Sequence, residues 1–261
     1  MKHLYRSWGA ALATGLMLSS PAQAQTHFSI GPSLGLNVST APFSHHTYTY
    51  RTTASVGVEA GVLAILSRRH AGLQAALLLS QKGFGIDDEN HSDDGRGSVS
   101  DSYVKARYRL NYLTLPLNLM YFLRADGQGL QVFGGGYLGL LLGGDYDYKY
   151  SFSSHFPGGA NGNGGATSGA VIPGDYFPNN SNIYGYSANN FYSRYFDAGL
   201  QGGLGYRFGR ALAQVSYSWG LRNLAADVQY GGPNRTISSS GVVYRNRAVQ
   251  ASFSYLLFPL R

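Results

Sequence analysis

The sequence predicts an all-β fold: an eight-stranded antiparallel, up-and-down transmembrane β-barrel with short periplasmic turns and long extracellular loops. Three observations predict it: an N-terminal export signal, long segments in which apolar residues alternate with small or polar ones, and connections that alternate between long and short. A tilted strand that crosses a bilayer needs roughly 9–11 residues, whereas strands of soluble proteins usually have about five or six. Alternation with a period of two directs the two residue sets to opposite faces, here lipid and the barrel interior.

Residues 197–208 and 214–221 carry the clearest alternation, and only a few residues around Gly209 and Arg210 separate them, which predicts a hairpin. In the first segment, one face holds Ala198, Leu200, Gly202, Leu204, Tyr206 and Phe208. In the second, one face holds Val215, Tyr217, Trp219 and Leu221, and the other holds Gln214, Ser216, Ser218, Gly220 and Arg222.

The same pattern predicts six further strands, and the connections between all eight sort by length. In chain order the six strands are residues 28–38, 55–66, 71–82, 107–123, 130–142 and 247–258. The long connections are 39–53, 84–104, 143–190 and 223–245, and the short ones are 67–70, 125–129 and 209–213. Outer-membrane barrels have short periplasmic turns and longer external loops, so both mature termini are expected in the periplasm. The alternative, a soluble exported β-sandwich, gives no reason for this sorting.

The first 24 residues have the composition of a cleaved signal peptide. Lys2 and Arg6 precede an apolar stretch at 8–18, and Ala22-Gln23-Ala24 forms a small-residue cleavage site. The mature chain, residues 25–261, is predicted to be one barrel domain with a long extracellular loop rich in Gly, Asn and Tyr at 143–190. The absence of cysteine excludes a lipoprotein anchor and disulfides.

The mature chain is only mildly basic. The signal peptide takes two of the 20 Lys+Arg and none of the 13 Asp+Glu, which leaves a net charge of +5. The basic residues form no dense run, so we expect no nucleic-acid partner.

Five ionisable residues fall on the inward parity of the predicted strands, and we expect them to form a structural polar network inside the barrel. They are Glu59, Lys82, Asp197, Arg207 and Arg222, with Arg207 near the periplasmic end and the others in the outer half. Eight strands leave just enough room for side chains, so a salt-bridge network that fills the interior is the first interpretation. A polar channel, or narrow pore for small solutes, is the alternative.

Catalytic and metal-binding patterns are weak. The acidic stretch 87–94 could bind Ca²⁺ through oxygen ligands, but its spacing does not match an EF-hand loop. The mature histidines show no H-E-x-x-H pattern, and no nucleophile elbow or phosphate loop occurs in a credible setting. A hydrolase at the outer rim, with His45, His91 or His155 beside a serine, is the third hypothesis. We expect no cofactor and no enzymatic activity.

The tyrosines of the 143–190 segment allow two interpretations. They could form a binding surface for a glycan or protein partner, or they could belong to strand extensions and an aromatic belt above the membrane. The tyrosines concerned are Tyr146, Tyr148, Tyr150, Tyr176, Tyr184 and Tyr186.

Five pieces of the sequence, taken in order, resemble the PorT-like outer-membrane β-barrel family of Bacteroidota-type bacteria. They are LSQKG at 79–83, YLTLPL at 112–117, VFGGGYL at 132–138, DAGL with GLGY at 197–206, and YSWGL with Asn223 at 217–223. The resemblance implies an integral outer-membrane protein with a structural or partner-binding role, and some relatives are linked to protein secretion and gliding. The partners it implies are outer-membrane lipid and a protein of the envelope or of a secretion assembly.

Overall fold

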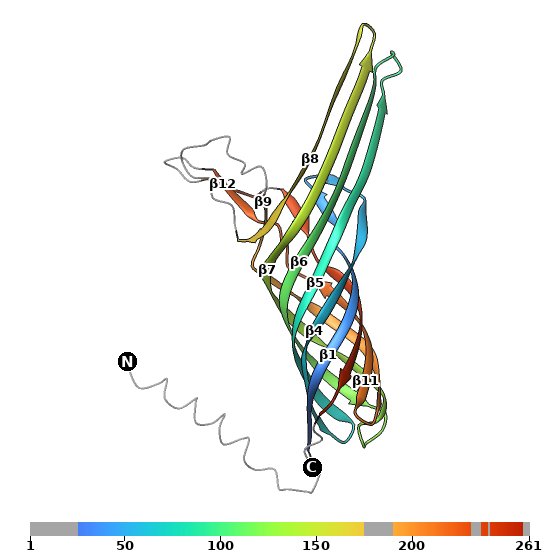
Figure 1. The fold of residues 1–261 in the computed structure, drawn as a ribbon, viewed down its shortest axis with the longest axis vertical. Coiled ribbons are helices and arrows are strands. Elements are labelled where there is room, and N and C mark those ends of the chain that lie inside the picture. The colour runs from blue at the N-terminus through green and yellow to red at the C-terminus, as the bar shows by residue number, and fades with distance from the viewer. Residues whose placement is uncertain (1–25, 175–189, 231–235, 240, 258–261) are drawn as a thin grey trace, which may run out of the picture.

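The computed structural model describes residues 26–174, 190–230, 236–239 and 241–257, and the fold is built from strands (Figure 1). The expected signal peptide, together with Tyr176, Tyr184 and Tyr186, lies outside the described residues. In the described part of the chain, no helix is both long enough and apolar enough to cross a membrane.

Eight strands close into a barrel in which each strand is antiparallel to both neighbours. They are β1 (His27–Thr40), β4 (Thr52–Arg68), β5 (Ala71–Asp93), β6 (Val99–Phe122), β7 (Gly129–Phe156), β10 (Phe196–Phe208), β11 (Ala211–Gly220) and β15 (Arg247–Tyr255). Pairing of β1 with β15 closes the ring, with Leu34 opposite Phe253 and Val38 opposite Val249. The predicted fold class and the order of its eight strands are therefore confirmed.

The alternation follows the expected parity in the barrel wall. Outward leucines such as Leu36, Leu119 and Leu138 are 59%, 72% and 59% exposed, whereas inward residues of the same strands are mostly buried. An exposed apolar belt of this size is stable only against an apolar solvent, here the hydrocarbon of a membrane.

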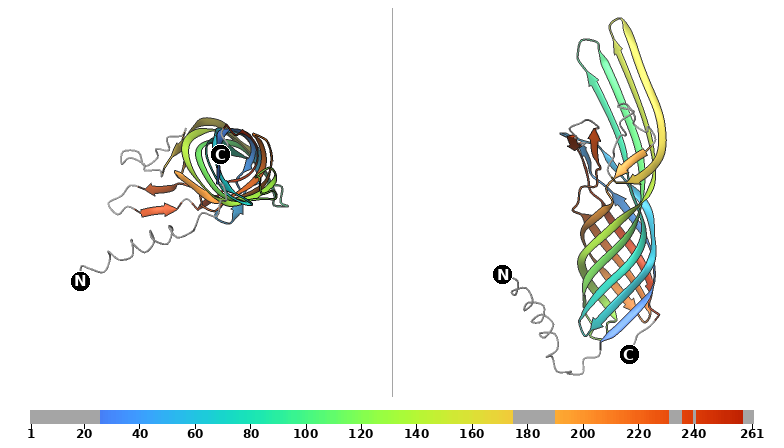
Figure 2. Two further views of the ribbon diagram at one scale, coloured as in Figure 1. Left: turned by 90° about the horizontal axis from the view of Figure 1, so that it is seen from below. Right: turned by 90° about the vertical axis from the view of Figure 1, so that its left-hand side faces the viewer.

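The connections at one end of the barrel are short. Arg69 and Gly209 adopt positive φ angles of 53° and 61° in the turns that follow β4 and β10, and the β6–β7 turn spans 123–128. The chain also enters β1 and leaves β15 at this end (Figure 2). The three short turns lie where the sequence places them.

At the opposite end, β5, β6 and β7 continue well beyond the barrel and are joined by β8 (Gly159–Pro173), which pairs with β7 (Figure 1). We call this part, residues 84–93, 99–110, 144–156 and 159–173, the projecting sheet. The prediction of loops at 84–104 and over the first part of 143–190 is wrong. The strands continue because each keeps a hydrogen-bonding neighbour after it leaves the apolar belt.

Short strands lie at the same end of the barrel, beside the projecting sheet. β2 (Phe43–His45), β3 (Tyr48–Thr49) and β14 (Val242–Tyr244) form a three-stranded sheet. β12 (Asp227–Tyr230) pairs with β13 (Thr236–Ser239), and β9 (Asn190–Ser193) runs parallel to the end of β8. The predicted loops 39–53 and 223–245 thus contain short strands, which are too brief to show an alternation in the sequence.

Candidate functional site

The barrel interior near the short turns is filled by an apolar cluster. Its buried members are Leu63, Ile65, Ala76, Met120, Phe122, Phe133, Leu212 and Leu256. Phe122, Ile65, Leu212 and Leu256 are at most 1% exposed. Since large side chains from several strands meet here, this half of the interior is a packed core.

Side-chain amides form a hydrogen-bonded chain across the barrel beside this cluster. Gln74 Nε2 donates to Gln214 Oε1 at 2.8 Å, and Asn118 Nδ2 donates to Gln74 Oε1 at 3.2 Å. Gln201 Nε2 in turn donates to Asn118 Oδ1 at 3.0 Å. Four strands, β5, β6, β10 and β11, are thereby tied together through their inward residues.

The charged residues of the interior gather around Lys82. Its Nζ lies 4.6 Å from the ring centroid of Tyr137 and 5.7 Å from that of Tyr112, a cation–π arrangement. Glu59 and Asp197 are the carboxylates that attract Lys82, and neither forms a direct ion pair with it in the described part of the chain.

Asp197 is fully buried and is held by two neutral donors. Tyr137 Oη donates to its Oδ2 at 3.2 Å, and Asn246 Nδ2 donates to the same oxygen at 2.9 Å. Its Oδ1 has no hydrogen-bond partner among the described residues. On the other side of the barrel, Gln250 Nε2 donates to Glu59 Oε2 at 3.3 Å. A buried carboxylate is stable when it is hydrogen-bonded and near a cation, so this arrangement stabilises the closed barrel.

The remaining two predicted members of the interior network lie elsewhere. Arg207 is 7% exposed at the short-turn end, where its guanidinium donates to the Gly209 carbonyl at 3.2 Å and to Ser29 Oγ at 3.4 Å. Arg222 is exposed and follows the end of β11. The prediction that it points inward is wrong, because β11 ends at Gly220 and the alternation stops with it.

Three residues of the charged cluster, Tyr112, Tyr137 and Asn246, are not among the predicted members of the interior network. The alternation of β6 and β7 places the two tyrosines on inward positions, but the prediction of the network considers only ionisable acids and bases. Asn246 precedes β15 and carries no such signal.

An aromatic and aliphatic cluster closes the other end of the interior. Its buried members are Ala41, Phe84, Ile86, Ala106, Tyr108, Leu110, Tyr112, Leu141, Tyr146, Val171, Leu224, Ala225 and Tyr244. The Phe84 and Tyr108 rings stack with centroids 4.7 Å apart, and Phe43 of β2 stacks on Phe84 at 6.0 Å. Tyr244 Oη donates to Ser193 Oγ at 2.6 Å. Packed layers therefore lie on both sides of the charged cluster.

The projecting sheet has two chemically different faces. The face continuous with the barrel interior carries Tyr146, Tyr148, Tyr150, Phe152 and Phe156, of which the last three are 39%, 44% and 42% exposed. The face continuous with the barrel exterior carries Asp87, Glu89, His91, Asp101, Lys105, Arg107, Arg109, Asp145, Asp147 and Lys149. Arg109 pairs with Asp145 at 2.7 Å on this outer face.

The two edges of the projecting sheet also differ. Residues 88–93 of β5 form one edge, which carries Asp88, Glu89, His91 and Asp93. Residues 159–166 of β8 form the other edge and contain only Gly, Ala and Asn. Among the described residues, neither stretch pairs with a second strand. Charge on an exposed edge opposes the addition of another strand, so the β8 edge is the less protected one.

The acidic stretch 87–94 belongs to the hairpin of β5 and β6. The Tyr48 hydroxyl donates a hydrogen bond to Asp88 Oδ2 at 2.6 Å. Asp94 Oδ1 accepts hydrogen bonds from the backbone N–H groups of Ser98 and Arg96, and these bonds lower the pKa of the Asp94 carboxyl group. In the described residues, no group of three or more His, Asp or Glu side chains is placed to hold a metal ion.

The histidines considered for hydrolysis lie apart. His91 hydrogen-bonds to Asp101, which raises the pKa of the imidazole. His45 is in β2 and His155 is near the far tip of β7. Within the described residues, no serine hydroxyl hydrogen-bonds to any of the three, so the geometry offers no support for a nucleophile.

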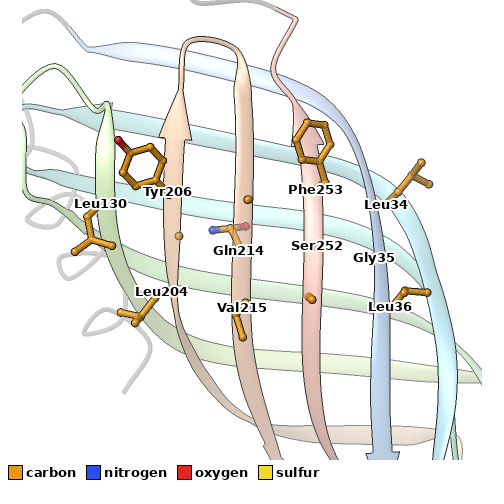
Figure 3. Close-up of a pocket in the computed structure, with 13 residues that line it drawn as sticks. Leu34, Gly35, Leu36, Leu130, Leu204, Tyr206, Gln214, Val215, Ser252 and Phe253 are labelled. Carbon is orange, nitrogen blue, oxygen red and sulfur yellow. The ribbon is translucent and has the colours of Figure 1, made fainter.

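The lipid-facing wall is shallowly hollowed where small residues lie between large ones. Figure 3 shows Leu34 and Leu36 of β1, Leu204 and Tyr206 of β10, and Phe253 of β15 around this hollow, which has a volume of about 760 Å³. Ala213 and Ala251 lie within it. The large side chains point away from the interior, as expected for a surface that contacts acyl chains.

The match to a protein family agrees with this architecture. A family model described as outer membrane protein beta-barrel domain matches residues 23–226. Among solved structures, Ail, the attachment invasion locus protein of Yersinia pestis, aligns at 9% identity over 89% of this chain and 99% of that chain, with a TM-score of 0.34. Neisserial surface protein A aligns at 10% identity over 86% and 96%, with a TM-score of 0.27. A search of curated proteins found none that matches.

Proposed function

The chain belongs to the outer membrane protein beta-barrel domain family, and from this premise we propose that it is a non-conducting anchor whose projecting sheet binds a protein partner in the cell envelope. The proposal includes the orientation expected from the sequence, with a cleaved signal peptide, the short turns in the periplasm and the projecting sheet outside. It assigns no enzymatic step to the chain.

The observation that carries the proposal is the contrast between a filled interior and an exposed sheet. Apolar side chains close the barrel on both sides of the charged cluster, which leaves Lys82, Glu59 and Asp197 as a structural group. A pore, by contrast, needs a continuous polar path through the barrel.

The projecting sheet supports partner binding through two features that lie together. The β8 edge carries backbone N–H and C=O groups without charged side chains, which suits an added strand. The exposed rings of Tyr150, Phe152 and Phe156 lie on the inner face beside that edge and offer apolar area with low conformational cost. The resemblance to PorT-like proteins favours a partner in a secretion, gliding or envelope assembly.

Conductance in planar bilayers tests the anchor. We expect folded protein, identified by a gel shift between boiled and unboiled samples, to give no discrete current steps under conditions in which a known porin conducts. Reproducible steps whose size changes in Lys82→Met would overturn the anchor and establish the narrow pore.

Site-specific photo-crosslinking in cells tests the partner surface. A crosslinker at Asn163 on β8 should form a discrete adduct, and one at Ser151 on the outer face of β7 should not. The double variant Asn161→Lys/Asn163→Lys should abolish an adduct formed from the Phe156 position, because lysine opposes strand addition. The matched variant Ser151→Lys/Ser153→Lys adds the same charge away from the edge and should leave the adduct intact. Equal loss in both variants would contradict binding at this edge.

A further inference from the structure

A second hollow lies on the outer face at the base of the projecting sheet. It has a volume of about 330 Å³ and is lined by residues of β4, β5, β6 and β7. It forms where β4 and β5 separate: their pairing ends at Ala54 opposite Phe84 and resumes only at Glu59 opposite Ser80. The hollow is therefore a consequence of the irregular register between two barrel strands.

A glycine in the lining of the hollow makes room for a hydroxyl group. Gly85 pairs with Thr53 on one side and with Arg107 on the other. A Cβ atom at Gly85 would meet Thr53 Oγ1 at 2.2 Å, so any larger residue would displace that hydroxyl group. The absence of a side chain at Gly85 therefore gives the Thr53 hydroxyl group its place in the lining of the hollow.

The lining carries more positive than negative charge. Lys105, Arg107 and Lys149 face Asp87 and Asp147. Both acids already have cationic neighbours, since Lys105 Nζ lies 3.9 Å from Asp87 and a guanidinium nitrogen of Arg109, just below the hollow, lies 3.9 Å from Asp147.

Two cations of the lining, Arg107 and Lys149, form no ion pair among the described residues. Arg107 lies opposite Asp147 in the pairing of β6 with β7, but the two form no ion pair. An arginine fork and a lysine ammonium beside hydroxyl donors such as Thr53 and Ser55 match the oxygens of a phosphate group.

The distance between the hollow and the hydrocarbon of the membrane indicates which kind of molecule carries the phosphate. On β6 the last outward residue of the apolar belt is Leu113, and Arg107 is three outward positions further along. At about 3.4 Å per residue and a tilt of roughly 35–45°, this places Arg107 about 15 Å above the hydrocarbon. The headgroup layer of an ordinary phospholipid is only about 5–8 Å thick, so a larger headgroup is needed to reach it.

We propose that this hollow binds a phosphate group on the sugar headgroup of an outer-leaflet glycolipid. The proposal uses the orientation stated under the proposed function, with the sheet outside, but it does not depend on partner binding. It gives Arg107 of β6 and Lys149 of β7 a specific lipid ligand above the headgroup layer of ordinary phospholipids.

Binding of purified, detergent-folded protein to lipopolysaccharide that carries phosphate on its core oligosaccharide tests the site. We expect saturable binding that weakens about tenfold or more for lipopolysaccharide whose core lacks phosphate and for Arg107→Ser/Lys149→Ser, because charge-assisted hydrogen bonds are lost. Arg68→Ser/Arg210→Ser removes two exposed cations at the short-turn end and should bind like the wild type. The gel shift on boiling confirms that each variant is folded.

Two further measurements keep the test decisive. Arg107→Lys retains the charge and the fold but loses the fork, so it should bind more weakly than the wild type and more tightly than the double variant. If inorganic phosphate binds as tightly as the glycolipid, the assignment to a lipid is overturned. Unchanged affinity in Arg107→Ser/Lys149→Ser would overturn the site itself, whatever the result for conductance or crosslinking.

Discussion

Three strands, β5, β6 and β7, run from the barrel into the projecting sheet, yet the faces of the two regions have opposite polarity. In the barrel, outward residues of β6 such as Leu115, Leu117 and Leu119 are apolar, and inward Thr114 and Asn118 are polar. Beyond Asn111, outward positions become Lys105, Arg107 and Arg109, and inward positions become Ala106, Tyr108 and Leu110. Along β6 the parity of the side chains is unchanged, and only the solvent on each side differs.

The barrel wall and the projecting sheet are therefore stabilised in different ways. The barrel wall is stabilised by lipid outside and by a packed interior, so a charge on its outer surface or an unpaired charge inside it is costly. The projecting sheet has water on its outer face, where charges are solvated and ion pairs contribute little. Equivalent substitutions in the two regions should therefore change the free energy of unfolding by very different amounts.

The largest difference is expected for the removal of a carboxylate. Asp197→Ala leaves buried Lys82 without one of the two carboxylates that attract it and should lower the free energy of unfolding by about 3–5 kcal/mol. Asp145→Ala removes the exposed partner of Arg109 and should cost about 0.2–1 kcal/mol. Urea titration in detergent, followed by the gel shift of folded protein, measures both. Similar midpoints for the two variants would mean that the charged cluster does not stabilise the barrel.

The next largest difference is expected for a new charge on the outer face. Leu117→Arg places a guanidinium near the middle of the apolar belt of β6 and should cost about 2–4 kcal/mol. Ser151→Arg adds the same side chain to the outer face of the projecting sheet and should change stability by less than about 0.5 kcal/mol. Unfolding and refolding in lipid vesicles measures the two. Tolerance of arginine at Leu117 would contradict the placement of the membrane.

The smallest effect is expected at the tip of the β5–β6 hairpin. The hydrogen bond to Asp101, together with the attraction of its charge, raises the pKa of His91 above the ordinary value near 6.5. The protonated form is the one favoured by folding, so its contribution is complete below about pH 6.5 and is lost as the pH rises through the raised pKa.

Amide-exchange protection of residues 90–102, corrected for the intrinsic pH dependence of exchange, should therefore fall between pH 6 and pH 9. The change should be absent in His91→Gln. A drop of the same size in that variant would assign the pH dependence to another group.

The barrel could be predicted from the sequence because the bilayer imposes one rule on every strand that crosses it. Apolar residues at every second position, over a length that matches the hydrocarbon, leave no other arrangement that satisfies the backbone. For this reason the order of the eight strands, the three short turns and the burial of Glu59, Lys82 and Asp197 all follow from parity. Parity fails for Arg222, which it predicts to point inward, because a single residue carries no sign that the strand has ended at Gly220.

The projecting sheet could not be predicted with the rule used for the barrel. Its strands keep the period of two, as in Lys105 to Leu110, but the apolar residues lie on the opposite parity. A search that follows apolar outward positions stops at the membrane boundary and assigns a loop. The inverted alternation is visible in the sequence, but only the pairing with β5 and β7 shows that it is a strand.

The sequence by itself determined the membrane barrel, since lipid on one face and a narrow interior on the other leave a regular pattern in local positions. Only the tertiary structure decided how the interior is closed, how far β5, β6, β7 and β8 project, and where β4 separates from β5 beside Arg107. These features depend on contacts between residues far apart in the chain, such as Phe43 with Tyr244 and Asp197 with Asn246. Such contacts have no period, because packing between distant segments depends on shape and hydrogen-bond geometry and not on the solvent outside.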